Sequence, residues 1–119
     1  LLAELQLRRG EPGRAIVNFR RAERMEAGVT DASRVALATA LYLRGETRAA
    51  REEASVAHDQ ECADPYAQAA CYGANLVLAR TAQDADARQA ATDAASSLRG
   101  ANPELAEAFD ALDARVTGS

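Results

Sequence analysis

A short internal repeat is the feature that most constrains the fold of this 119-residue chain. The residues Arg-Gly-Glu at positions 9–11 recur 35 positions later, at 44–46. A further step of 35 places Tyr72-Gly73 on Leu37-Ala38, in each case a large residue followed by a small one. A period of this length is typical of supersecondary units that stack, because one unit cannot bury its apolar face alone.

Helix start and stop signals divide each period into two helices. Gly10 and Gly45 are typical helix ends, and Asp64-Pro65 and Asn102-Pro103 combine an N-cap residue with proline at the first helical position. Gly100 is expected to end the helix that precedes it. We predict seven helices with short connections of the kind that join antiparallel neighbours: 1–9, 12–27, 31–44, 47–62, 65–81, 85–99 and 103–116.

Composition supports an all-α protein and excludes several function classes. The chain has 30 Ala and 14 Arg, both strong helix formers, and only 4% aromatic residues, which argues against a β-sandwich or barrel. A net charge of −4 does not suit a nucleic-acid binder, and no apolar run is long enough to span a membrane. The absence of Lys beside so much Arg and Ala is typical of bacteria with GC-rich genomes.

The first residue bears on whether the sequence is a fragment. Leu1 is not Met and stands inside an apolar pattern, so we expect the chain to be a fragment of a longer protein. Any signal peptide or anchor would then precede Leu1, which leaves the compartment open between cytoplasm and periplasm.

These features resemble the tetratricopeptide repeat (TPR) family. That family has a large and a small residue in its first helix, a glycine in the turn, and a small–bulky–small pattern in its second helix, as in Ala15, Phe19 and Ala22. In the internal alignment, Ala54 and Ala91 stand at the position of Phe19. The resemblance implies an α-solenoid in a single domain, with repeats at 1–30, 31–64 and 65–101 and a capping helix at 103–116. An unrelated Ala-rich helical bundle is the alternative.

The resemblance also implies a function and a surface. It implies a non-catalytic scaffold, adaptor or assembly subunit without a cofactor, which binds an apolar helix or an extended protein segment in its concave groove. A helical regulatory or sensor segment of a larger signalling or transcription protein is the alternative. The exposed ends of such a stack also favour self-association. By position, the groove residues are Glu4, Leu7, Arg8, Val35, Thr39, Tyr42, Leu43, Ala70, Ala74 and Val77. Packing against a further repeat that the fragment lacks is the alternative role for these residues.

The terminal helix has an amphipathic pattern that suits a cover for the end of the stack. Its outward residues are predicted to be acidic, namely Glu104, Glu107, Asp110 and Asp113. Its inward residues are predicted to be Leu105, Ala108, Phe109, Leu112 and Val116.

Few residues suggest chemistry. His58 and Cys62 share a helix face and Cys71 lies beyond the next turn, but their spacing matches no zinc module, so we expect no metal. Nothing is assembled around Cys62 to make it a nucleophile. We expect two buried free thiols, with a Cys62–Cys71 disulfide as the alternative if the two helices cross closely. The arginines at 20, 21 and 24 alternate with acids and are expected to form a salt-bridged surface.

Overall fold

The computed structural model describes residues 2–24 and 31–118, and these residues form helices and turns without strands. The seven α-helices confirm the all-α class. The last residues of the segment 12–27 lie outside the described residues. The helices are α1 (Leu2–Arg8), α2 (Pro12–Glu23), α3 (Asp31–Leu43), α4 (Thr47–Glu61), α5 (Gln68–Thr81), α6 (Ala85–Ala101) and α7 (Ala106–Thr117), with a 3₁₀ turn η1 (Pro103–Leu105) before α7.

The repeated tripeptide makes the same turn twice. Gly10 and Gly45 have φ of 77° and 86°, in the left-handed region that favours glycine. The amide of Glu11 donates to the carbonyl of Gln6 at 2.9 Å, and the amide of Glu46 donates to that of Leu41 at 2.9 Å. Both bonds satisfy carbonyls at the end of a helix. The sequence repeat is therefore also a structural repeat.

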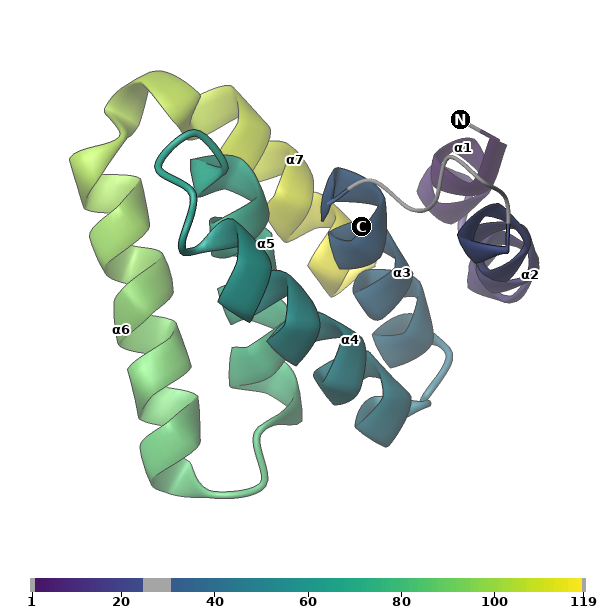
Figure 1. The fold of residues 1–119 in the computed structure, drawn as a ribbon, viewed down its shortest axis with the longest axis horizontal. Helices are drawn as coiled ribbons and strands as arrows, with labels where there is room; N and C mark the ends of the chain where they lie inside the picture. Colours follow the sequence, from purple (N-terminus) through teal and green to yellow (C-terminus); the bar gives the residue numbers. More distant parts are fainter. Residues whose placement is uncertain (1, 25–30, 119) are drawn as a thin grey trace.

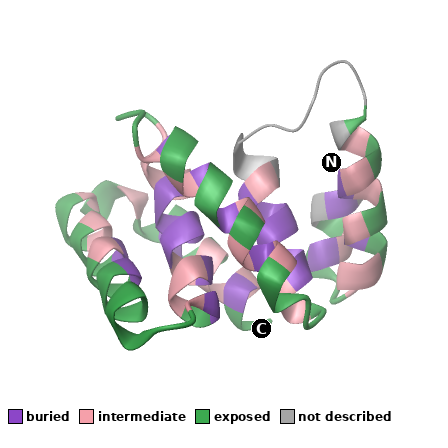
Figure 2. Cartoon of the chain, turned by 60° about the horizontal axis from the view of Figure 1, so that its bottom comes forward, coloured by how far each residue is buried: buried purple, intermediate pink, exposed green. Residues whose placement is uncertain are grey.

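Consecutive helices pack in pairs, α1 with α2, α3 with α4, and α5 with α6 (Figure 1). The pairs are joined by contacts of α2 with α3 and of α4 with α5, and the first helices of the last two pairs, α3 and α5, also touch. Helix α7 then packs across α3 and α5. Buried residues gather where these helices meet, whereas much of α6 is exposed (Figure 2).

Two predicted helix boundaries are wrong for local reasons. The Asp64 carboxylate accepts the amide of Tyr66 at 2.9 Å and so closes a turn, and α5 begins three residues later than predicted, at Gln68. Gly100 does not end α6, which continues through Ala101, and the Asn102 side chain donates to the carbonyl of Leu98 at 2.9 Å.

Small residues stand at the helix crossings, as the repeat pattern predicts. Ala15 and Phe19 are fully buried on α2, although Ala22 is only half-buried. On α5, a Cβ added to Gly73 would lie 2.6 Å from Cγ1 of Val35 and 3.3 Å from Cδ2 of Leu112. The absence of a side chain at Gly73 therefore lets α3, α5 and α7 meet.

A Gly73→Ala variant is expected to lower the free energy of unfolding by about 1–2 kcal/mol. Overpacking costs about 1–3 kcal/mol, and the higher helix propensity of Ala offsets up to about 1 kcal/mol of that. Urea unfolding followed by circular dichroism measures the difference. Gly100→Ala is the matched control on α6, where an added Cβ meets nothing within 4 Å. A Gly73→Ala protein as stable as Gly100→Ala would contradict the close crossing.

Candidate functional site: an arginine-edged cleft beside the terminal helix

Helix α7 covers the face that the sequence predicts to be the groove. Leu112 packs against Val35 of α3 and Ala74 of α5. One turn later, Val116 joins the central apolar cluster that contains Val77 and Leu41. The capping helix therefore lies along α3 and α5 and fills the space between them.

The predicted groove residues consequently fall into separate environments. Five of them are buried in the core: Leu7, Val35, Thr39, Ala74 and Val77. Three are half-buried, namely Tyr42, Leu43 and Ala70, and Arg8 is exposed. The side chain of Glu4 lies outside the described residues.

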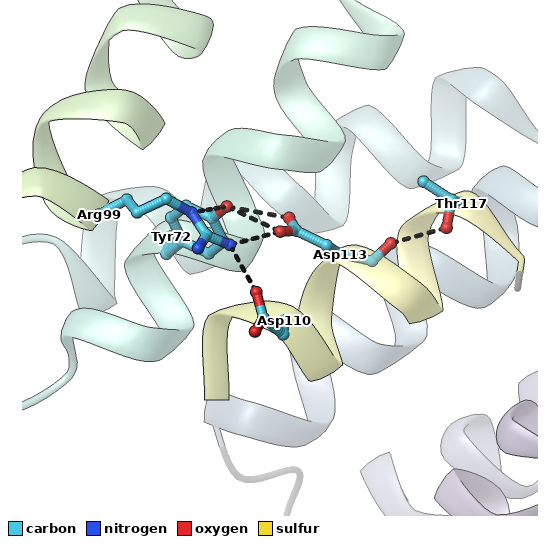
Figure 3. Close-up of polar contacts among 5 residues, drawn as sticks. All are labelled: Tyr72, Arg99, Asp110, Asp113 and Thr117. Carbon is cyan, nitrogen blue, oxygen red and sulfur yellow. Dashed lines mark hydrogen bonds and ion pairs between the residues drawn. The ribbon is translucent and has the colours of Figure 1, made fainter. Parts of the chain in front are cut away.

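A polar cluster fastens α7 to α5 and α6 (Figure 3). The hydroxyl of Tyr72 donates to Oδ1 of Asp113 at 2.9 Å, and Nε of Arg99 donates to the Tyr72 oxygen at 3.2 Å. Arg99 also forms ion pairs with Asp113 and with Asp110, the second at 3.2 Å. Its guanidinium stands over the rings of Tyr72 and Phe109, whose centroids are 4.2 Å apart. We call these five residues the α7 latch.

The α7 latch corrects the predicted outer face of the terminal helix. Asp113 was expected to be solvated, but it is half-buried against Tyr72 and Arg99. Ala108 was expected to point inward and is exposed. Phe109 and Val116 are buried as predicted. The latch residues are bound to one another, so they hold a helix in place.

Stability should fall at alkaline pH because of Tyr72. Burial, opposed by the bond from Arg99 and assisted by Asp113, raises the pKa of Tyr72 above its ordinary value. Folding therefore favours the neutral phenol, and this stabilisation is present below the unfolded pKa of about 10 and is lost as pH rises through the folded pKa. We expect the free energy difference between wild type and Tyr72→Phe, from urea unfolding at pH 8 to 11, to shrink above pH 10. A constant difference would contradict the burial of this hydroxyl.

Beside the latched helix lies a cleft of about 630 Å³, between the α1–α2 turn, the end of α3 and the last turns of α7. It falls within the size range of about 300–1,000 Å³ that is usual for ligand sites. Its lining combines apolar side chains with three arginines: Leu7, Arg8, Arg9, Gly10, Pro12, Leu43, Ala111, Ala114, Arg115 and Gly118.

The edge of this arginine cleft is positively charged. Arg8 is the last residue of α1 and Arg9 follows it, and neither forms an ion pair with a carboxylate side chain that the structure describes. Arg115 contributes a third guanidinium from α7. The neighbouring Glu11 pairs with Arg14 at 3.5 Å. The cleft therefore offers apolar contact surface together with cations that favour an anionic ligand.

Local geometry explains how distant segments form the arginine cleft. Gly10 turns the chain sharply, so Arg9 and Pro12 stand on either side of the turn. Gly118 ends α7 with φ of 78°, and an added Cβ there would lie 3.4 Å from Cδ2 of Leu43. Leu7, Arg8 and Leu43 belong to the groove that the sequence predicts, whereas the lining residues of α7 do not. The sequence signal that marks the end of α7 is Gly118.

The cysteines form a disulfide, so the expectation of two free thiols is wrong. Cys62 and Cys71 are bonded, with their Cα atoms 4.9 Å apart, because the turn at 62–67 brings the end of α4 back to the start of α5. No group of three or more His, Cys, Asp or Glu side chains in residues 2–24 and 31–118 could hold a metal ion.

An arginine of α2 pairs with an acid on a distant helix, which the sequence pattern does not predict. Arg20 reaches Glu53 of α4 at 3.1 Å, and Arg34 of α3 approaches the other oxygen of Glu53 at 3.7 Å. Arg24 donates to the carbonyl of Arg20 at 3.3 Å. Glu53 therefore connects three helices.

No helix in the described ranges combines the length and apolar character needed to cross a membrane. A scan against protein-family models and searches of curated proteins and of solved structures found no match.

Proposed function

We propose that this protein is a TPR-type helical repeat module whose function is to bind another protein and not to catalyse a reaction. The repeated left-handed glycine turn, the pairing of consecutive helices and the contact between α3 and α5 support this reading. Stacked hairpins of this kind usually present a binding surface to a partner segment.

The binding site in this proposal is the arginine cleft, because α7 packs over the predicted groove residues Val35, Ala74 and Val77. Three of the predicted groove residues line this cleft, namely Leu7, Arg8 and Leu43. Its occupant is a short partner segment with apolar side chains that alternate with carboxylates. The apolar side chains would contact Leu43 and Pro12, and the carboxylates would pair with Arg8 and Arg9. The observation that carries the proposal is this apolar lining together with Arg8 and Arg9, which form no ion pair with any carboxylate side chain that the structure describes.

Fluorescence anisotropy with a labelled 12-residue peptide of Leu and Glu tests the proposal. We expect saturable binding that weakens as salt is raised from 50 to 500 mM. The double variant Arg8→Glu/Arg9→Glu should weaken binding at least about tenfold, since each lost charged contact costs about 1 kcal/mol or more. The same variant should bind a peptide in which Lys replaces Glu.

The matched control is Arg48→Glu/Arg88→Glu, which reverses two exposed arginines outside the cleft. It should bind the Glu peptide as wild type does. An equal loss in both double variants would show only a general charge effect and would overturn the assignment. Absence of binding by wild type would overturn it as well.

A further inference from the structure

We propose that a second cavity, bounded by α4, α5 and α6, binds a small carboxylic acid with an apolar body. This cavity measures about 430 Å³ and shares no residue with the arginine cleft. Arg51 and His58 of α4 line it from one side, Leu78 of α5 contributes apolar surface, and Ala87 and Ala91 of α6 line it as well. We call it the α4–α6 cavity.

Small side chains of α6 form much of the apolar part of the cavity. In the internal repeat, Ala91 occupies the position that Phe19 holds in the first unit. Phe19 is fully buried, and so is Ala54 at the same position of the second unit, whereas Ala91 lines the cavity. Leu78, Ala87 and Ala94 complete an apolar surface around Ala91. The cavity therefore has room for a hydrocarbon group next to Ala91.

The polar part of the cavity is suited to an anion. Nη1 of Arg51 donates to the carbonyl of Thr81 at 2.8 Å, which fixes the guanidinium at the cavity. No carboxylate among the described residues forms an ion pair with Arg51, whereas Arg48, one turn earlier, pairs with Glu52 at 3.4 Å. The remaining N–H groups of Arg51 are therefore available as charge-assisted donors.

Two other groups at the cavity match a carboxylate ligand. Ser55 contributes a hydroxyl and His58 an imidazole to the lining, and Nδ1 of His58 lies 3.5 Å from Oδ1 of Asp59. The one acid in the lining, Asp84, caps α6, since its Oδ1 accepts the amide of Ala87 at 2.7 Å. A ligand carboxylate at Arg51 with its hydrocarbon group over Ala91 satisfies both parts of the cavity.

Octanoate is the probe for this proposal, with octanol as its uncharged analogue. In ¹H–¹⁵N spectra of the ¹⁵N-labelled protein, octanoate should shift the amides of Arg51, Leu78 and Ala91 and saturate with a Kd of about 0.1–1 mM. Arg51→Gln should raise that Kd about tenfold, and Arg48→Gln on the same helix should leave it unchanged. Octanol should bind wild type no better than octanoate binds Arg51→Gln.

Two variants test the apolar part without removing a charge. Ala91→Phe restores the residue of the first repeat and should abolish octanoate binding with helicity retained. Because Ala91 is buried, Ala87→Leu at an exposed position of the same cavity is the second variant and should weaken binding at least about fivefold. Equal affinity for octanol and octanoate, or shifts that saturate elsewhere on the protein, would overturn the proposal. Peptide binding in the arginine cleft should be the same in all these variants.

Discussion

Replacement of Phe109 by Ala is expected to lower the free energy of unfolding by about 3–5 kcal/mol. Phe109 is completely buried, and its ring packs on Tyr72 beneath the guanidinium of Arg99. The change removes that contact and leaves a cavity where α7 meets α5 and α6. Because the α7 latch is built around this ring, we also expect α7 to detach before the other helices unfold.

Urea unfolding followed by circular dichroism measures the loss, and hydrogen exchange of the α7 amides reports whether that helix detaches first. Tyr66→Ala is the matched control, because Tyr66 is an aromatic residue that is 95% exposed and should change stability by less than about 0.5 kcal/mol. Losses of similar size in the two variants would contradict the observed packing of α7.

The second large effect is expected from loss of the disulfide. The double variant Cys62→Ser/Cys71→Ser removes a cross-link between residues nine positions apart. The chain-entropy relation for a closed loop of this length gives a loss of about 2.6 kcal/mol at 25 °C. The turn at 62–67 and the start of α5 should then show the largest increase in hydrogen exchange, because the disulfide connects them to the end of α4.

Dithiothreitol provides the control for this prediction. It should lower the unfolding midpoint of wild type toward that of the double variant and leave the variant itself unchanged. If wild type and the double variant unfolded at the same urea concentration without reductant, the disulfide would not stabilise the fold.

Local sequence signals were sufficient for most of the fold. Gly10 and Gly45 identify their turns because a left-handed residue at a helix end is a local requirement that glycine meets best. The start of α5 was mispredicted because an Asp-Pro pair can begin either a helix or a turn. The hydrogen bond from Tyr66 to Asp64 and the bond between the cysteines favour the turn.

The candidate site was harder to predict, since it depends on contacts between distant segments. The amphipathic pattern of α7 predicts that one of its faces packs against other helices. It does not show that Leu112 packs against the cluster of Val35, which lies 77 positions earlier. The packing of α7 covers Val35, Ala74 and Val77, whereas Leu7, Arg8 and Leu43 line the arginine cleft. Likewise, nothing in the sequence around Arg99 indicates that its side chain contacts Tyr72 and two aspartates of α7.

Site-specific photo-cross-linking tests the central proposal most directly. A benzophenone amino acid replaces Ala111, which is exposed on α7 and lines the arginine cleft, or Ala108, which is exposed one turn earlier and does not line it. With the labelled Leu/Glu peptide, we predict a cross-link from position 111 that unlabelled peptide competes away, and little or none from position 108. Equal cross-linking from both positions, or stronger cross-linking from position 108, would contradict binding in the arginine cleft.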